Sequence, residues 1–216
     1  MEKKIVLFQG DSITDFGRDR KNSAAHGTGY AQRVAGILKA NEPYKYTTYN
    51  RGISGNRIVD VYARIRSDII NLKPDYMSIL IGVNDVWHEL PGRNGVSADK
   101  YERIYDMLIQ EILQELPDIK IMILEPFVLP GSATVSTDEY PDRWEYFRPE
   151  VELRAAAAKR IAQKYDLTFV PLQAMFDGVN ADAPADGYWL IDGVHPTAAG
   201  HELITRAWVK AFETMK

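Results

Sequence analysis

The segment YERIYDMLIQEILQELPDIKIMIL (residues 101–124) contains the two patterns that decide the fold. From Tyr101 to Leu116, apolar residues recur at the i, i+3, i+4 and i+7 positions of a helix, with acidic residues opposite them, and Pro117 then ends the helix. The apolar run Ile119–Leu124 follows and predicts a strand buried on both faces. A helix followed closely by a buried strand is the repeating unit of an α/β protein.

The same alternation extends along the chain in both directions. Short β-rich runs predict five strands, at Ile5–Phe8, Tyr46–Tyr49, Met77–Ile81, Ile119–Leu124 and Thr168–Val170. Helical periodicity predicts helices near Tyr30–Ala40, Arg57–Asn71, Tyr101–Leu116, Val151–Tyr165 and Ala198–Phe212. This order predicts an α/β protein with a central five-stranded parallel sheet, covered by helices on both faces. Without an internal repeat or a linker-like stretch, residues 1–216 are expected to form one domain.

Composition excludes several classes of chemistry. The 216 residues include 30 acidic and 26 basic side chains, for a net charge of −4, with four histidines and no cysteine. Disulfides, zinc–thiolate sites, iron–sulfur clusters and thiol nucleophiles are therefore impossible. The slightly acidic balance offers no basic surface for nucleic acid.

The N-terminal sequence carries no targeting pattern. Its start, MEKKIVLFQG (residues 1–10), has only four consecutive apolar residues, which is too short for the core of a signal peptide. No segment approaches the roughly 18 apolar residues of a membrane-spanning helix. We therefore expect a cytoplasmic protein with no membrane partner.

Two segments, 126–149 and 177–197, do not fit the alternation and are predicted to be long loops. Long loops in a compact domain are often functional. In open α/β sheets, ligands bind outside the carboxyl ends of the strands. The residues that follow each predicted strand are therefore the candidates for a functional site.

Three strands are followed by residues that can bind a developing negative charge. Ser12, in Gly10-Asp11-Ser12, either caps a helix or acts as a nucleophile whose own N–H helps to hold an oxyanion. Gly55, within Asn50–Asn56, either forms a turn or brings its N–H to a ligand. Asn84, in Asn84-Asp85, either forms an Asx turn or supplies an amide donor.

The fourth motif is Asp192-Gly-Val-His195-Pro196. Three residues of spacing on a short turn can bring the Asp192 carboxylate to Nδ1 of His195, which fixes the tautomer and leaves Nε2 to accept a serine proton. The alternative is an aspartate–histidine pair in a surface turn. The catalytic alternative is favoured because the other three motifs end at the same edge of the sheet.

Together, Gly10-Asp11-Ser12, Gly55, Gly82-Val-Asn84-Asp85 and Asp192-x-x-His195 resemble, in order, the four blocks of the SGNH (GDSL-type) hydrolases. The resemblance implies a flavodoxin-like three-layer α/β/α sandwich and ester hydrolysis without a metal or other cofactor. It also implies a role for each matching residue: Ser12 as nucleophile, His195 as general base and acid, Asp192 as the residue that orients His195, and Ser12, Gly55 and Asn84 as the oxyanion hole.

Longer stretches look like one subgroup, the intracellular acetylxylan esterases of bacteria. They are Gly10–Arg18, Gly27–Tyr30, Ile81–Trp87 and Val194–His201. This resemblance implies a serine esterase that removes acetyl groups from xylo-oligosaccharides. Rings near the expected rim suit sugars: Trp87, His88, Phe127, Tyr140, Trp144, Tyr188 and Trp189. Among the residues expected to contact the substrate are Asp11, Trp87, His88 and Trp189.

Two other functions are kept open. A lysophospholipase or acyl-thioesterase of the same family would prefer longer acyl chains. A non-catalytic flavodoxin-like module would bind a ligand at the same edge without hydrolysing it. The expected partner is a small ester. The alanine-rich stretch 154–160 could pack within the fold or between subunits, so a homo-oligomer is possible.

Overall fold

A central sheet of five parallel strands organises the computed structural model, which describes residues 3–216. The strands are β1 (Lys4–Gly10), β2 (Tyr46–Asn50), β3 (Tyr76–Leu80), β4 (Lys120–Leu124) and β5 (Thr168–Val170). They pair in the order β2-β1-β3-β4-β5 with every neighbouring pair parallel. This is the flavodoxin-like order, so the predicted α/β class and five-stranded parallel sheet are confirmed.

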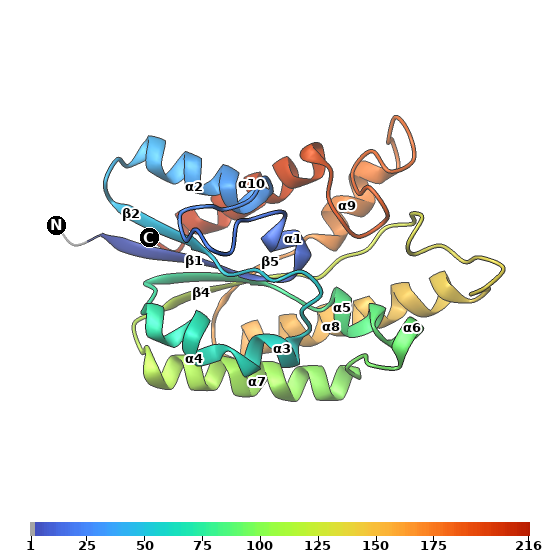
Figure 1. Ribbon diagram of the computed structural model, residues 1–216, viewed down its shortest axis with the longest axis horizontal. Helices are drawn as coiled ribbons and strands as arrows, with labels where there is room; N and C mark the ends of the chain where they lie inside the picture. The colour runs from blue at the N-terminus through green and yellow to red at the C-terminus, as the bar shows by residue number, and fades with distance from the viewer. Residues whose placement is uncertain (1–2) are drawn as a thin grey trace.

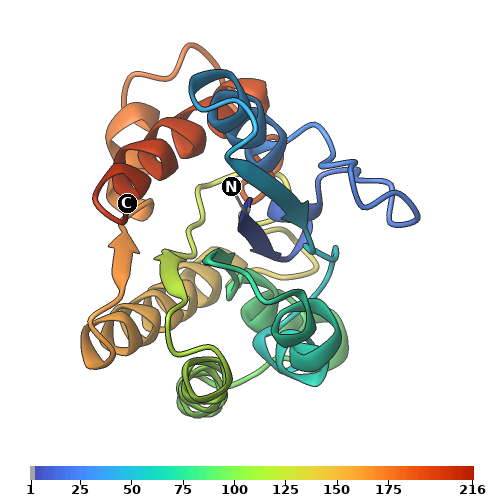
Figure 2. The same cartoon turned by 90° about the vertical axis from the view of Figure 1, so that its left-hand side faces the viewer.

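Helices cover both faces of the sheet and complete the predicted three-layer sandwich (Figures 1 and 2). One face carries α2 (Tyr30–Asn41), α9 (Gln173–Asn180) and α10 (Ala198–Glu213). The other face carries α3 (Ile58–Ala63), α4 (Ile65–Asp68), α7 (Ala98–Glu115) and α8 (Arg143–Lys164). Short helices follow two of the central strands: α1 (Ser12–Asp15) after β1, and α5 (Val83–Trp87) with α6 (Glu89–Gly92) after β3.

The core lies in two layers because side chains alternate across each strand. In β1, Val6 and Phe8 face the cluster under α2 and α10, whereas Leu7 faces the cluster under α3 and α7. All three side chains are fully buried. Burial on both faces explains why the strands read as nearly continuous apolar runs in the sequence.

The helix expected near Arg57–Asn71 is broken into α3, α4 and a 3₁₀ turn, Ile70–Leu72. Arg64, between α3 and α4, leaves helical geometry at φ −113° and ψ 19°. Its guanidinium group donates to Gln9 Oε1 at 2.6 Å and to the carbonyl of Arg51 at 2.9 Å. The prediction of one continuous helix is therefore wrong, because apolar periodicity marks the helical segment but does not reveal the breaks within it.

The predicted loop 126–149 is shorter than expected because α8 begins at Arg143 and contains Pro149. Proline is unfavourable inside a helix because it cannot donate to the carbonyl four residues earlier. Here the exposed Pro149 lies in the second turn of a 22-residue helix, which tolerates it. Likewise α9 occupies 173–180, so the second expected loop begins after Asn180.

Three alanines of the stretch 154–160 are buried within the chain: Ala155, Ala157 and Ala158.

The strand order predicts where a ligand would bind, namely at the carboxyl ends of β1 and β3. In the order β2-β1-β3-β4-β5, the connections leave β1 and β3 in opposite directions, so the carboxyl ends of these strands flank the crevice where ligands bind in such folds. Over residues 3–216, no helix is both long enough and apolar enough to cross a membrane.

Candidate active site

Ser12 lies at the carboxyl end of β1, where it is the first residue of α1. Asp11 caps this helix, since its Oδ1 accepts the N–H of Ile13 at 3.0 Å. The four-residue helix turns Ser12 away from the strand and leaves its side chain half-buried. The N-cap function that the sequence offered as an alternative for Ser12 is therefore performed by its neighbour.

A continuous chain of hydrogen bonds connects the three residues expected to form a catalytic triad. Ser12 Oγ lies 2.9 Å from Nε2 of His195, and Nδ1 of the same ring lies 2.7 Å from Oδ2 of Asp192. The second carboxylate oxygen, Oδ1, accepts the backbone N–H groups of Val194 and His195 at 2.9 and 2.8 Å. This geometry lets a neutral His195 accept the hydroxyl proton of Ser12.

The electrostatics of the pair agree with that geometry. Partial burial raises the pKa of Asp192, but hydrogen bonds from the ring and backbone of His195 outweigh this effect and bring the pKa to about 2. Asp192 is therefore ionised at neutral pH. Its hydrogen bond raises the pKa of His195 above the ordinary value of 6.5, despite the opposing effect of burial. The carboxylate thus makes His195 a stronger base.

A short turn delivers Asp192 and His195 to the edge of the sheet. The backbone N–H of Ile191 donates to the carbonyl of His195 at 2.7 Å, and Leu190 and Pro196 form an isolated antiparallel bridge. These bonds close the turn around Asp192 and Val194. The local backbone therefore holds Asp192 and His195, which are three residues apart in sequence, close enough for their side chains to form a hydrogen bond.

Donors that could hold an oxyanion are present at the ends of three adjacent strands. Within residues 3–216, neither the Ser12 N–H nor the Gly55 N–H donates to another protein atom. Asn84 Nδ2 donates one hydrogen to the carbonyl of Asn56 at 3.1 Å, which orients the amide and leaves its second hydrogen available. The contact between Asn84 and Asn56 also joins the end of β3 to the Gly55 segment.

A cavity of about 380 Å³ opens beside Ser12 and His195. Four further residues line it: Phe16, Gly17, Thr28 and Ser54. Phe16, Gly17 and Thr28 come together where the chain folds back after α1, since the N–H of Thr28 donates to the carbonyl of Phe16 at 3.0 Å, whereas Ser54 belongs to the Gly55 segment. None of the four was predicted as a lining residue, because their meeting depends on tertiary contacts. The glycines on both sides of Thr28 are the only sequence signal of that turn.

Asp11, an expected substrate contact, and Phe127, an expected rim aromatic, are in fact buried. Asp11 is 1% exposed, so the structure contradicts the expected contact with substrate; its carboxylate lies beneath the site and caps α1. Phe127 is fully buried and packs on Phe176 with ring centroids 4.5 Å apart. Asp11 directly follows β1 and Phe127 lies three residues after the end of β4, so a position close to a strand end does not guarantee exposure.

The remaining substrate contacts stay predictions. Trp87 is half-buried, with its ring centroid 5.8 Å from that of His195. His88 is half-buried at the end of α5. Trp189 Nε1 donates to the carbonyl of Val179 at 3.0 Å, so its ring is held by the last turn of α9.

The other buried histidines lie outside this chain of hydrogen bonds. His201 Nδ1 accepts the N–H of Tyr30 at 3.1 Å, and burial lowers the pKa of His201 to about 3. His26 lies between the carbonyls of Ala24 and Thr48. Within residues 3–216, neither of these histidines forms a hydrogen bond with Ser12.

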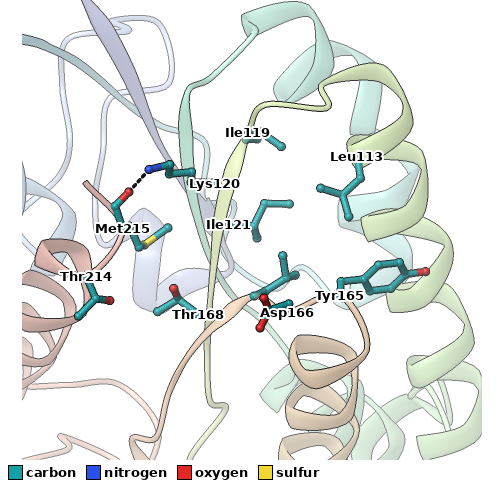
Figure 3. A pocket seen from close by; sticks show the side chains of 10 residues that line it. Leu113, Ile119, Lys120, Ile121, Tyr165, Asp166, Thr168, Thr214 and Met215 are labelled. Carbon is teal, nitrogen blue, oxygen red and sulfur yellow. Dashed lines mark hydrogen bonds between the residues drawn. The ribbon is translucent and has the colours of Figure 1, made fainter.

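A second cavity, of about 330 Å³, lies at the amino ends of β4 and β5, on the opposite side of the sheet from the carboxyl ends that carry Ser12 (Figure 3). Lys120 projects into it and donates to the backbone carbonyl of Met215. This second cavity shares no lining residue with the cavity at Ser12. Within residues 3–216, no group of three or more histidine or acidic side chains is arranged to hold a metal ion.

A serine, a histidine and an aspartate joined by hydrogen bonds, here at the carboxyl ends of the strands of a flavodoxin-like sandwich, are the arrangement typical of serine hydrolases. Residues 8–203 match the sequence profile of the GDSL-like lipase/acylhydrolase family, and the chain belongs to that family. It is accordingly a carboxylic ester hydrolase, as the sequence analysis predicted.

Individual relatives cover nearly the whole chain. An acetylxylan esterase of Geobacillus stearothermophilus is 37% identical over 216 aligned residues, which cover 95% of this chain and 92% of the relative. The crystal structure of Axe2, an acetylxylan esterase from the same organism, superposes with a TM-score of 0.81 at 35% identity and covers 96% and 93% of the two chains. A GDSL-like protein from Parabacteroides merdae gives a TM-score of 0.87 at 36% identity, with 97% and 96% covered.

Proposed function

We propose that this chain is a serine esterase that removes acetyl groups from acetylated carbohydrates of the xylo-oligosaccharide kind. The observation that carries the proposal is the hydrogen-bonded chain Ser12–His195–Asp192, in a family member 37% identical to an acetylxylan esterase. Solved structures of the relative Axe2 include catalytic mutants in which a serine or an aspartate is replaced by alanine. These mutants support a serine mechanism for that relative.

In the proposed first step, Ser12 Oγ forms a bond to the acetyl carbonyl carbon while its proton passes to His195 Nε2. The carbonyl oxygen becomes negative and accepts hydrogen bonds from the Ser12 N–H, the Gly55 N–H and Asn84 Nδ2. The bond from the carbonyl carbon to the sugar oxygen then breaks, and His195 gives its proton to that oxygen. Acetyl-serine remains on the enzyme.

In the second step, water attacks acetyl-serine while His195 accepts a proton from the water. The bond to Ser12 Oγ breaks, the proton returns to that oxygen, and acetate leaves. Throughout both steps, the ionised Asp192 stabilises the positive charge that His195 acquires.

The lining of the cavity supports a short acyl group. Among the six residues that line it, Phe16 has the only large apolar side chain, and none is a leucine, isoleucine, valine or methionine. A long acyl chain needs a continuous apolar surface, because its binding energy grows by about 0.8 kcal/mol for each buried methylene group. A hydroxyl-lined cavity with one aromatic ring suits an acetylated sugar better.

The test compares acyl chain length and leaving group on the same preparation. We expect the highest kcat/KM for acetyl among p-nitrophenyl acetate, butyrate and octanoate, and we expect acetate release from acetylated xylo-oligosaccharides by NMR. A rate that rises from acetate to octanoate would instead identify a lysophospholipase or acyl-thioesterase. In parallel, Ser12→Ala should abolish turnover while leaving thermal unfolding unchanged.

A fluorophosphonate probe separates the enzyme from a binding module. We expect one phosphonyl adduct by intact mass in the wild type and none in Ser12→Ala. An unmodified wild-type chain under native conditions would favour a non-catalytic ligand-binding module. The cytoplasmic location and the oligomeric state stay predictions.

A further inference from the structure

The segment that carries Gly55 belongs to no helix or strand, yet the proposed mechanism needs its N–H at a fixed point. Gly55 has φ +82°, a left-handed conformation that favours glycine. Electrostatic stabilisation of an oxyanion works when donors are already in place before the charge develops. The structure must therefore hold this loop by contacts from elsewhere in the chain.

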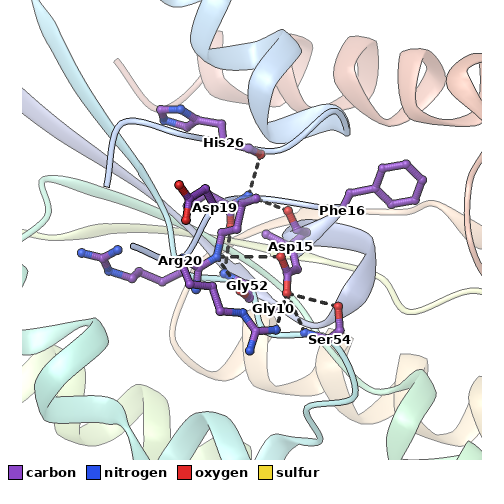
Figure 4. A network of polar contacts seen from close by, with 12 residues as sticks. Gly10, Asp15, Phe16, Asp19, Arg20, His26, Gly52 and Ser54 are labelled. Atoms are coloured by element: carbon purple, nitrogen blue, oxygen red, sulfur yellow. Dashed lines mark hydrogen bonds and ion pairs between the residues drawn. The ribbon is translucent and has the colours of Figure 1, made fainter. Parts of the chain in front are cut away.

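One buried carboxylate makes those contacts on the side of Ser54. Oδ2 of Asp15 accepts the backbone N–H of Ser54 at 3.0 Å and the Ser54 hydroxyl at 3.1 Å (Figure 4). It also accepts a hydrogen bond from Arg20 Nη2 at 2.7 Å. All three donors bind the same carboxylate oxygen. Through two of these bonds Asp15 fixes Ser54, the residue directly before Gly55.

The charge of Asp15 matches this role. Asp15 is only 3% exposed, and burial alone would raise its pKa. The hydrogen bonds from Arg20 and Ser54 outweigh that effect and hold the pKa below its ordinary value. Asp15 is therefore ionised at neutral pH, and an ionised acceptor forms stronger hydrogen bonds than a neutral one.

Asp15 also couples the loop to the nucleophile. Ser12 and Asp15 are the first and last residues of α1, so one helical turn carries both groups. The loop rests directly on this turn, because a Cβ added at Gly52 would lie 2.5 Å from the backbone nitrogen of Asp15. The N–H of Ile53 donates to the carbonyl of Gly10 at 3.0 Å, and Arg18 Nε donates to the carbonyl of Gly52 at 2.8 Å.

A second carboxylate holds the other end of the loop. Asp85 is fully buried beside Asn84, and its two oxygens lie 3.1 and 3.2 Å from the N–H of Ile58. The Gly55 segment is thus fixed between the strand ends that carry Ser12 and Asn84. Of these two contacts, only the one from Asp15 reaches the residue next to Gly55.

We propose that Asp15 is a positioning residue that sets the Gly55 N–H in the oxyanion hole by holding Ser54. The proposal rests on the esterase function and oxyanion donors proposed above. Asp15 itself does not line the cavity at Ser12. Its loss should therefore weaken binding of the transition state and leave binding of the ground state and the basicity of His195 unchanged.

The experiment compares Asp15→Asn and Asp15→Ala with the wild type on p-nitrophenyl acetate. Asparagine keeps one oxygen for the Ser54 N–H but loses the charge, whereas alanine loses every contact. We expect kcat to fall about tenfold in Asp15→Asn and about a hundredfold in Asp15→Ala, with KM within twofold. The loss in Asp15→Ala is then no greater than the roughly 10²–10³-fold cost of removing an oxyanion donor outright.

Two further readouts separate positioning from general damage to the fold. Affinity for a trifluoromethyl ketone, which forms an oxyanion on Ser12, should fall by the same factor as kcat/KM in each variant. The acid limb of the pH profile of kcat/KM should stay in place. The matched control is Asp106→Asn on α7, since Asp106 also accepts from a cation and a hydroxyl, Lys164 and Tyr165. It should leave both kcat and ketone affinity unchanged.

Ser54→Ala keeps the proposal testable if the Asp15 variants do not fold. It removes the hydroxyl bond to Asp15 together with one hydroxyl of the cavity lining, keeps the Ser54 N–H bond to Asp15, and should reduce kcat and ketone affinity two- to fivefold. Full kcat and full ketone affinity in the folded Asp15 variants, or in Ser54→Ala when those do not fold, would overturn the positioning role. Failure of the wild type to form a fluorophosphonate adduct would instead overturn the proposed function.

Discussion

A single carboxylate, that of Asp192, holds His195 at two points. Oδ2 lies 2.7 Å from ring Nδ1, and Oδ1 accepts the backbone N–H of the same residue at 2.8 Å. The backbone contact fixes the distance between the two residues, and the ring contact fixes the tautomer in which Nε2 faces Ser12 at 2.9 Å. Position and basicity of His195 therefore depend on one side chain.

Asp192→Asn should lower kcat/KM by about 10⁴, because an amide can stabilise the wrong tautomer of His195 and cannot stabilise its cation. The hydrogen bond from the carboxylate raises the pKa of His195, so its removal should move the acid limb of kcat/KM to lower pH. The pH profile of p-nitrophenyl acetate hydrolysis measures both effects. An acid limb that stays in place or moves to higher pH would contradict this account.

Asn84→Ala should lower kcat by about 10²–10³ and change KM little, since an oxyanion donor acts mainly in the transition state. The side chain is 5% exposed and donates to the carbonyl of Asn56, so some loss of stability is also expected. Steady-state kinetics should be measured well below the midpoint of thermal unfolding. Equal losses in ground-state binding and in kcat/KM would argue against an oxyanion role.

The fold was predictable because its signals are local. The apolar spacing of residues 101–116 and the run 119–124 gave a helix and a strand with nearly correct bounds, and βαβ connections leave few topologies for five such units. The start of α8 at Arg143 was not predictable from periodicity, because Pro149 normally marks a boundary. Whether a helix tolerates a proline depends on the packing around it.

The candidate site was predictable only where the chemistry lies in short motifs. Ser12 directly follows β1, whereas Asp192 and His195 lie in the turn between α9 and α10 and were predictable from their own three-residue spacing. The segment after β4 holds that turn, since the N–H groups of Leu129 and Ala133 donate to the carbonyls of Gly193 and Asp192. The hydrogen bond between Asp15 and Ser54 joins residues that are 39 positions apart in sequence, and no local sequence pattern predicts that contact. The burial of Asp11 was missed for the same reason, since it depends on what covers α1.

Phe127→Ala distinguishes a core residue from a residue at the rim. Because the ring is fully buried against Phe176, we expect the free energy of unfolding to fall by about 3–5 kcal/mol. The kcat/KM of the folded variant should stay close to that of the wild type at 20 °C. A large loss of activity with unchanged stability would instead restore the rim position that the sequence suggested.

Asp11→Asn should change how the stability of the protein depends on pH. Burial raises the pKa of Asp11 from 3.8 to about 7, and its Oδ2 has no hydrogen-bond partner within residues 3–216. Between these two values the folded state binds more protons at Asp11 than the unfolded state does. The contribution of this group to stability therefore falls as pH rises through that window, by about 4 kcal/mol in total.

Asparagine keeps an oxygen for the Ile13 N–H but never ionises, so the variant should lose this pH dependence. Relative to the wild type, Asp11→Asn should therefore gain stability progressively from pH 4 to pH 8. Guanidinium unfolding at each pH measures the difference, and Asp106→Asn serves as the control. Because the pKa of Asp106 is lowered in the folded protein, its contribution changes only below pH 4, and the control should be flat from pH 5 to pH 8. A constant difference between Asp11→Asn and the wild type over the same range would mean that Asp11 is already ionised at pH 5.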